Sequence, residues 1–366
     1  MPTLRIQGPV GARTLINGRE YDYFSGTGYL GLQTHPEVIQ AAVDAVQRYG
    51  VSTASSRGGL GEHPLYDALE RAACAYFGCE KVLYFASGYL GMAILLQGSN
   101  RAFDHIFIDA DAHFSLWDAA RGSNKPLTVF HHLSPERLGE ALKHDLVPGE
   151  RPLVLSDGLF PISGEIAPLP DYLELVKPHH GMVFLDDAHA VGVLGLDGRG
   201  TLDYYGIQPG EGRACGTLAK ALGGYGGILW GEGAWIDRLD QESAVCVGAS
   251  PPPLVVAAAS AQALAVARRS PELRDHLRAN AAQAKAGLRS LGWELPDTPS
   301  PILCLEARSG VSLERMRNGL FERGIAVTLV RGYTSTPPGG ALRIAIFATH
   351  TPEQIERLAK AIQSLI

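Results

Sequence analysis

The sequence predicts an α/β protein with a mostly parallel central sheet, followed by a smaller C-terminal α+β domain. Short apolar runs alternate with longer stretches of helical periodicity over most of the chain, a pattern typical of βαβ units. This alternation ends after residues 248–253, where an Ala-rich helical pattern begins. The chain has 366 residues, more than a single core usually holds, so two domains are expected.

A series of apolar runs is predicted to form the strands of the large domain. Residues 63–78 and 134–146 lie between such runs and space their apolar residues as an amphipathic helix does. The alternation favours a parallel sheet covered by helices. The runs are KVLYFA near residue 81, HIFIDA near 105, LTVFH near 127, PLVLSD near 152, GMVFLDD near 181 and GGILWG near 226.

The rest of the chain predicts a linking helix and a small domain. The linking helix is expected at about residues 252–288. After it come PILCLEA, a helix from about Ser312, the runs IAVTLV and LRIAIFA, and a closing helix. Thr351 is the expected N-cap of that last helix, with Pro352 at its first position. The predicted organisation is an N-terminal arm at 1–35, a large domain at 36–255 and a small domain at 256–366.

Composition and charge favour small-molecule partners. The net charge is −6 and the 32 basic residues are scattered, so the basic surface of a protein that binds nucleic acid or anionic membranes is not expected. The longest apolar runs contain too many small and polar residues for a membrane span. The N-terminal residues show no targeting pattern, which predicts a cytoplasmic location. The five cysteines form no C-x-x-C pair, so neither a disulfide framework nor structural zinc is expected.

One lysine stands in an unusual setting. Lys220 lies within GTLAKALGGYGG, residues 216–227, among small apolar residues and glycines with no other charge. Burying an ammonium group without a partner is costly, so a site that uses the amine chemically would explain its position. An ordinary loop lysine is the alternative.

Polar residues gather where the predicted strands end. Open parallel sheets place functional residues at the carboxyl ends of their strands. We therefore expect the residues at these ends to form one site. They are Asp186 and His189 at and after the end of VFLD, His113 after HIFIDA, and Ser87, Gly88 and Tyr89 after VLYF.

Together with the lysine, these residues are the parts of a site for pyridoxal 5'-phosphate (PLP). Lys220 would form the Schiff base, and Asp186 would keep the pyridine nitrogen protonated so that the ring accepts electrons. Residues 87–89, at a predicted helix start, would bind the phosphate with Thr217.

A metal site is the alternative for the same acidic segment. Asp186, Asp187 and His189 are of the types that bind metals. However, no further ligand appears at a characteristic spacing, so we expect no metal.

The sequence also resembles a known family. Ordered along the chain, GYLGLQTHPEV, FASGYLG, LFPISGEIAPL, VFLDDAHAVGVLGLDGRG, GTLAKALGGYGG and LRIAIFATHTPEQIERL look like motifs of the α-oxoamine synthases. That family contains 8-amino-7-oxononanoate synthase, 2-amino-3-ketobutyrate CoA ligase, 5-aminolevulinate synthase and serine palmitoyltransferase. The resemblance runs from about residue 18 to the end of the chain. It implies the fold-type I architecture of PLP-dependent transferases, which is aspartate aminotransferase-like.

The resemblance implies a role for each candidate residue. Lys220 matches the Schiff-base lysine and Asp186 the partner of the pyridine nitrogen. His189 matches the histidine that hydrogen-bonds the phenolic oxygen of the ring, and His113 the histidine stacked on the ring face. Arg343 matches the arginine that takes the substrate carboxylate, a task that suits its planar fork of donors. A surface histidine and a structural ion pair are the alternatives for His113 and Arg343.

Departures from the family pattern fall in segments that the resemblance assigns to substrate. Thr27 stands where an asparagine usually helps to hold the amino-acid carboxylate. Residues 161–163 read Pro-Ile-Ser in place of Ser-Met-Asp. Ser250 stands for a threonine that reaches the phosphate of a neighbouring subunit, and the N-terminal arm is shorter than is typical.

The resemblance implies a decarboxylating condensation of a small α-amino acid with an acyl thioester such as an acyl-CoA, carried out by a homodimer. Lys220 would remove the Cα proton, and His189 would polarise the thioester carbonyl. The first alternative is an aminotransferase, or another enzyme that forms or cleaves carbon–carbon bonds without a CoA ester. The second is a PLP-binding protein that has lost catalysis.

Overall fold

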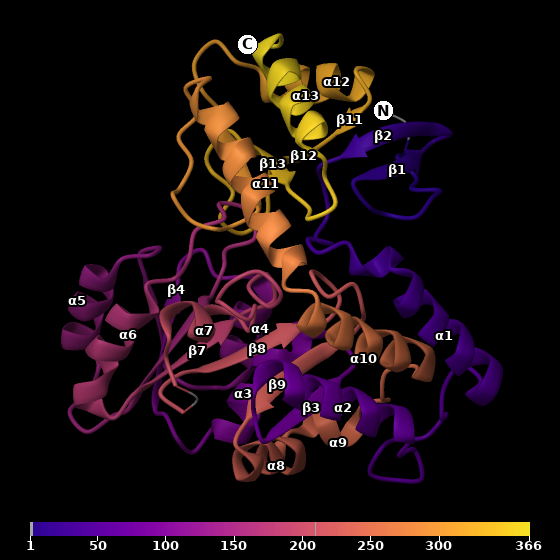
Figure 1. The fold of residues 1–366 in the computed structure, drawn as a ribbon. Coiled ribbons are helices and arrows are strands. Elements are labelled where there is room, and N and C mark those ends of the chain that lie inside the picture. The colour runs from indigo at the N-terminus through magenta and orange to yellow at the C-terminus, as the bar shows by residue number, and fades with distance from the viewer. Residues whose placement is uncertain (1–2, 209) are drawn as a thin grey trace.

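The computed structural model describes residues 3–208 and 210–366, and a seven-stranded sheet lies at the centre of the larger domain (Figure 1). The strand order is β3-β9-β8-β7-β6-β4-β5. Strands β4 to β8 run parallel, and β9 is antiparallel to both β3 and β8. This confirms the predicted α/β class. The strands are β3 (Lys81–Phe85), β4 (His105–Asp109), β5 (Leu127–Phe130), β6 (Pro152–Asp157), β7 (Met182–Asp186), β8 (Arg213–Thr217) and β9 (Gly227–Gly231).

Strand β8 is the one member of this sheet that was not predicted. Its sequence, RACGT, contains an arginine, a glycine and a threonine, so it does not read as an apolar run. Residues 214–217 are nevertheless buried because β8 pairs with a strand on each side. Tertiary packing decides its conformation where local pattern does not.

Helices cover both faces of the large sheet. Ile106 and Ile108 of β4 pack on the face covered by α3, α4 and α8, while Phe107 packs on the face of α5 and α6. This two-sided burial explains why the parallel strands read as continuous apolar runs. The helices of this part are α1 (Pro36–Tyr49), α2 (Pro64–Phe77), α3 (Gly91–Ser99), α4 (Phe114–Gly122), α5 (Pro135–Asp145), α6 (Leu169–Val176), α7 (Thr201–Tyr205), α8 (Gly233–Glu242), α9 (Ala244–Gly248) and α10 (Leu254–Arg269), with 3₁₀ turns η1 (Leu32–Thr34), η2 (Gly88–Leu90) and η3 (Lys177–His179).

The small domain lies above the carboxyl ends of the parallel strands in Figure 1 and includes two small sheets. One is antiparallel, in the order β10-β13-β12, and the other joins the N-terminal arm to the C-terminal part of the chain in the order β1-β2-β11. The elements are β1 (Arg13–Ile16), β2 (Arg19–Tyr23), α11 (Glu272–Arg289), β10 (Ile302–Glu306), α12 (Leu313–Glu322), β11 (Ile325–Ala326), β12 (Thr328–Val330), β13 (Ala341–Ala345) and α13 (Pro352–Gln363).

Two helix predictions for this region have different outcomes. Helix α13 begins as predicted: the Thr351 hydroxyl accepts from the backbone N–H of Gln354, whose side chain accepts from the N–H of Thr351 in return. The continuous linking helix expected at about residues 252–288 is wrong, because α10 and α11 are separate helices. Pro271 lacks an N–H and disfavours helical geometry at Ser270, so the helix breaks there.

Across the described ranges 3–208 and 210–366, no helix combines the length and the apolarity that crossing a membrane requires.

Asp22 provides a test of how the arm is held. Its buried carboxylate receives hydrogen bonds from Arg13 (2.9 Å) and Gln354 (2.8 Å) and pairs with Arg357 of α13. Burial raises the pKa of Asp22, but the hydrogen bonds from Gln354 and Arg13 and the two positive charges outweigh it, so the pKa lies below its usual value. A carboxyl whose pKa is depressed by folding stabilises the protein above its unfolded pKa.

We therefore expect Asp22→Asn to lower the free energy of unfolding by about 1–3 kcal/mol at pH 7. The deficit should shrink as pH falls towards the pKa of folded Asp22, because the wild-type carboxylate is then protonated too. Urea unfolding at several pH values measures this, with the exposed Asp240→Asn as control. A deficit that is the same at every pH would contradict the assigned charge interaction.

Candidate active site

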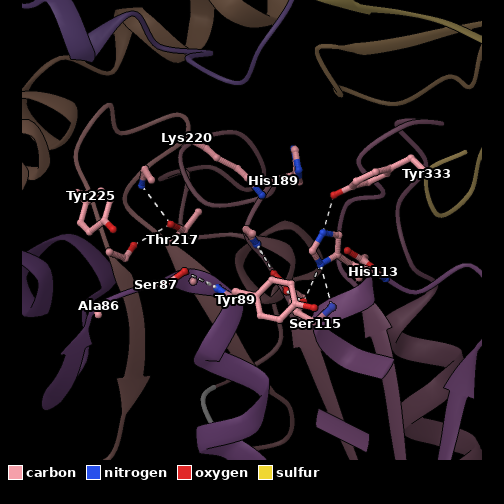
Figure 2. Close-up of a pocket in the computed structure, with 16 residues that line it drawn as sticks. Ala86, Ser87, Tyr89, His113, Ser115, His189, Thr217, Lys220, Tyr225 and Tyr333 are labelled. Atoms are coloured by element: carbon pink, nitrogen blue, oxygen red, sulfur yellow. Dashed lines mark hydrogen bonds between the residues drawn. The ribbon is translucent and has the colours of Figure 1, made fainter. Parts of the chain in front are cut away.

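The predicted polar strand ends meet in one cavity of about 280 Å³ at the carboxyl edge of the large sheet (Figure 2). Strands β3, β6, β7 and β8, the start of α4 and one loop of the small domain supply its walls. The sequence-predicted residues on the walls are Ser87, Gly88, Tyr89, His113, Asp186, His189, Thr217 and Lys220. Arg343 and Thr27 do not line this cavity.

Lys220 follows β8 in a tight turn closed by the Gly223 N–H on the Lys220 carbonyl (2.9 Å). Gly223 has φ +64°, and a Cβ there would lie 2.2 Å from the backbone nitrogen of Gln33, so this turn requires glycine. The lysine side chain is half-buried. Burial lowers the pKa of Lys220, and the negative charges of Asp186 and Asp157 oppose this effect. The amine is therefore a stronger candidate for a neutral nucleophile and base than a surface lysine is.

Two carboxyl groups lie on the cavity wall. Asp186, the last residue of β7, is 5% exposed and accepts from the backbone N–H of Ala188 (2.9 Å), and its second oxygen lies 3.4 Å from the hydroxyl oxygen of Ser115. Asp157, the last residue of β6, accepts from the backbone N–H of His113 (2.8 Å). Burial and the neighbouring charge of Asp186 raise the pKa of Asp157 well above its usual range. Of the two carboxyl groups, Asp157 is therefore the one whose surroundings favour the protonated form.

His113 caps helix α4. Its Nδ1 accepts from the backbone N–H of Ser115 (3.2 Å) and lies 2.7 Å from the Ser115 hydroxyl. Its Nε2 lies 2.6 Å from the phenolic oxygen of Tyr333 (Figure 2). Burial lowers the pKa of His113, so the ring is neutral at neutral pH.

His189 is buried and its tautomer follows from its partners. Arg343 Nη2 donates to the Tyr29 hydroxyl (3.0 Å), which lies 2.8 Å from Nδ1 of His189. The arginine can only donate, so the Tyr29 oxygen accepts from it, and Nδ1 is the one acceptor that the described residues offer to the hydrogen of this buried hydroxyl. Burial and the positive charges of Lys220 and Arg343 lower the pKa of His189 well below its usual value. The single ring proton then lies on Nε2 of a residue that lines the cavity.

Residues 87–89 form the cap of the 3₁₀ turn η2 and lead into α3. Ser87 Oγ accepts from the Tyr89 N–H (3.3 Å), and a Cβ on Gly88 would lie 2.8 Å from Cβ of Thr217. The glycine thus allows the β3 and β8 ends to approach closely. The Thr217 hydroxyl donates to the Gly226 carbonyl (2.7 Å), so its hydrogen is already used within the protein.

Arg343, on β13, is 7% exposed and lies beside the cavity residues rather than on the wall. Its Nε donates to the Pro161 carbonyl (2.6 Å), and Nη1 donates to the Gly26 carbonyl (2.9 Å). With Nη2 on Tyr29, three of the five N–H groups of the guanidinium are used, and each terminal nitrogen keeps one. One N–H on each terminal nitrogen is the set of donors with which a guanidinium can bind a carboxylate.

Three comparisons place this site in a family. The aminotransferase class I and II family matches residues 24–362. The 8-amino-7-oxononanoate synthase of Methylococcus capsulatus is 34% identical over 365 residues, covering 99% of this chain and 93% of that protein. The chain belongs to the aminotransferase class I and II family, in its α-oxoamine synthase branch.

Solved structures of this branch have the same fold. Serine palmitoyltransferase from Sphingomonas wittichii superposes with a TM-score of 0.91 at 27% identity, over 99% of this chain and 91% of that one. A high-resolution structure of SPT with PLP internal aldimine superposes with a TM-score of 0.91 at 25% identity, over 99% and 92% of the two chains. The fold-type I architecture that the resemblance implied is confirmed.

Several wall residues of this α-oxoamine synthase were not predicted from its sequence. Asp157 ends a predicted strand exactly as Asp186 does, so the rule of strand ends could have identified it. Ser115 and Tyr333 gave no such signal. Ser115 lies in the first turn of α4, and Tyr333 lies in an irregular loop that only the tertiary fold brings to the cavity.

No group of three His, Cys, Asp or Glu side chains is arranged to hold a metal ion within the described part of the chain.

The Tyr29 hydroxyl joins Arg343 to His189, and its removal tests whether this bridge stabilises the protein. In Tyr29→Phe, the buried His189 and Arg343 each lose a hydrogen-bond partner. We expect the free energy of unfolding to fall by about 1–3 kcal/mol in urea denaturation, because unsatisfied buried polar groups are costly. Tyr204→Phe, which removes a half-exposed phenol elsewhere, should stay within about 0.5 kcal/mol of the wild type. Equal stability of the two variants would refute the bridge.

Proposed function

We propose that this chain is a PLP-dependent α-oxoamine synthase, which condenses a small α-amino acid with an acyl thioester and releases carbon dioxide. The observation that carries the proposal is the meeting of Lys220, Asp186 and His189 in one cavity of a chain similar over its full length to 8-amino-7-oxononanoate synthases. The relatives indicate the reaction class, and the cavity supplies the groups that it needs.

The cavity suits PLP by the chemistry of its groups. The Lys220 amine would hold the cofactor covalently, and the Asp186 carboxylate would hold a proton on the pyridine nitrogen. The backbone N–H groups at the start of η2 and α3 would bind the phosphate, where glycine at position 88 keeps the wall open. Thr217 would donate to the phosphate after its hydroxyl turns away from the Gly226 carbonyl. When bound, PLP supplies an electron sink that stabilises negative charge at the Cα of an amino acid.

Lys220 would also act as the base. With the amino acid bound, the free Lys220 amine would take the Cα proton. Its lowered pKa favours the neutral form that this step requires. Across the cavity, His113 would pack against the flat ring as a neutral imidazole.

His189 and Arg343 would place the two substrates. The Nε2–H of His189 would donate to the phenolic oxygen of the cofactor and to the thioester carbonyl during attack. The two free N–H groups of Arg343 would receive the carboxylate of the amino acid. No carboxylate pairs with Arg343 among the described residues, so a substrate anion would be its counter-charge.

Release of free CoA thiol tests the reaction. The PLP-loaded protein is mixed with glycine, L-alanine or L-serine and with acyl-CoA esters of several chain lengths, and thiol is measured colorimetrically. We expect thiol release that requires one amino acid and one class of acyl-CoA. If an amino acid instead converts the cofactor to its pyridoxamine form while thioesters have no effect, the chain is an aminotransferase. Cofactor binding with neither reaction would indicate a protein without catalysis.

Lys220→Ala is the matched variant for that assay. It should abolish thiol release, and borohydride reduction should no longer fix PLP to the protein, as judged by mass spectrometry. Lys285 is the internal control, since burial lowers its pKa to about 8 but it donates to the Thr298 carbonyl away from the cavity. Fixation of PLP at Lys285 in the wild type would contradict the assignment of Lys220.

We propose that the enzyme is a homodimer. Helix α1 exposes Ile39, Val43 and Val46, and the loop after it exposes Leu60 at 97%. A second copy would cover this apolar surface. Ser250, in the exposed segment after α9, would then be available to reach the phosphate of the neighbouring site.

Sedimentation at micromolar concentration should give twice the 39.1 kDa chain mass. The double variant Ile39→Asp and Val43→Asp should sediment as a monomer, because each buried charge in an apolar interface is costly. A wild-type protein that sediments as a monomer, or a double variant that remains a dimer, would place the interface elsewhere or exclude it.

A further inference from the structure

Tyr333 is the one wall residue, among those the structure describes, that the small domain contributes to the cavity. It lies in the loop between β12 and β13, and its phenol extends over the cavity towards His113 (Figure 2). The side chain is 39% exposed, and its ring also makes an edge contact with Phe114. Neither the strand-end rule nor the proposed reaction has assigned it a role.

The direction of the hydrogen bond between Tyr333 and His113 follows from the helix cap. Nδ1 of His113 accepts the Ser115 backbone N–H, so that nitrogen carries no proton, and the Ser115 hydroxyl 2.7 Å away donates to it as well rather than to the more distant Asp186. A neutral ring has one proton, which must then lie on Nε2. Nε2 therefore donates to the Tyr333 oxygen at 2.6 Å.

This direction leaves the phenolic hydrogen of Tyr333 free. The hydroxyl has no second partner among the described residues, and it lies at the wall of the cavity. Burial and the charges of Asp157 and Asp186 raise the pKa of Tyr333, so the phenol keeps its hydrogen at neutral pH. Tyr333 thus has an unused donor where a ligand would lie.

The surroundings indicate which ligand group would accept from it. Tyr333 and Arg343 are carried by the same pair of strands, because β12 pairs with β13 with Thr328 opposite Arg343. They therefore belong to one small-domain unit, and the charge of Arg343 acts on the Tyr333 phenol. An anion is repelled by Asp186 at the sheet edge and attracted towards Arg343. Thr27, which stands where the family's second carboxylate donor is expected, has no side-chain hydrogen bond in the described chain and lies off the wall.

We infer that the Tyr333 hydroxyl determines substrate specificity by donating a hydrogen bond to the carboxylate of the amino acid, beside Arg343. The inference rests on the proposed function, and it names a residue that replaces the missing donor at position 27. His113 acts on this bond as a positioning residue, because its Nε2–H orients the phenolic hydrogen towards the cavity.

The test compares amino acids with the amines that lack their carboxylate. Isothermal titration calorimetry of PLP-loaded wild type and Tyr333→Phe measures binding of glycine against methylamine, L-alanine against ethylamine and L-serine against ethanolamine. We expect Tyr333→Phe to bind the preferred amino acid of the wild type about 10- to 100-fold more weakly than the wild type does. This is the range for a lost hydrogen bond to a charged group. The matching amine should change by less than about 2-fold. Tyr204→Phe should bind both ligands as the wild type does.

Each other outcome is decisive. If Tyr333→Phe weakens binding of the amino acid and of the amine equally, the phenol only packs against the cavity. If it weakens binding of neither, the phenol is not part of the site. Both results overturn the inference while the proposed function stands. A wild type that binds none of the amino acids would overturn the proposed function and this inference with it. Histidine nitrogen NMR, with His113 assigned by its absence in His113→Gln, gives a second measurement. A proton found on Nδ1 rather than Nε2 would also overturn the inference.

Discussion

The burial of the Arg343 guanidinium is the constraint on which the arrangement of this protein depends. A cation that is 7% exposed must have its donors satisfied, and here the acceptors come from different parts of the chain. The Gly26 carbonyl and the Tyr29 hydroxyl belong to the N-terminal arm, the Pro161 carbonyl belongs to the large domain, and the arginine belongs to the small domain. These bonds fix the three parts against one another, and through Tyr29 they also fix the tautomer of His189.

The charges within the cavity are arranged so that few of them are uncompensated. Two carboxyl groups and one amine lie together at the strand ends, and the two carboxyls cannot both ionise easily in a buried setting. Asp157 is the member whose protonated form is favoured, because burial and the charge of Asp186 raise its pKa although the hydrogen bond from the His113 N–H opposes this. The charge of Asp186 in turn opposes the lowering of the Lys220 pKa by burial. Because both neighbouring histidines are neutral, they serve as directed donors rather than as further cations.

Much of this site could be predicted because the local sequence shows where each strand of a parallel sheet ends, and functional residues lie at those ends. Apolar runs identify the strands, and the polar residue at each carboxyl end must lie at the shared edge, which located Asp186, His113 and residues 87–89. Strand β8 could not be predicted in this way because its small and polar residues form no apolar run. They are buried because β8 pairs with neighbouring strands. Tyr333 could not be predicted from the strand ends either, because its position depends on how the two domains pack against each other. That contact joins positions 113 and 333, which no periodicity in the sequence relates.

The departures from the family pattern act on the substrate through the same arginine. Thr27 and residues 161–163 do not line the cavity, so they cannot alter the chemistry of the cofactor site directly. Ile162 is instead 4% exposed and packs against Cys304 and Ala341 of the small domain, which anchors the segment that presents the Pro161 carbonyl to Arg343. The altered Gly26-Thr27 segment presents the other carbonyl. We therefore expect changes at both segments to alter the direction of the two free N–H groups of Arg343. A change of substrate range can arise in this way while Lys220, Asp186 and His189 remain in place.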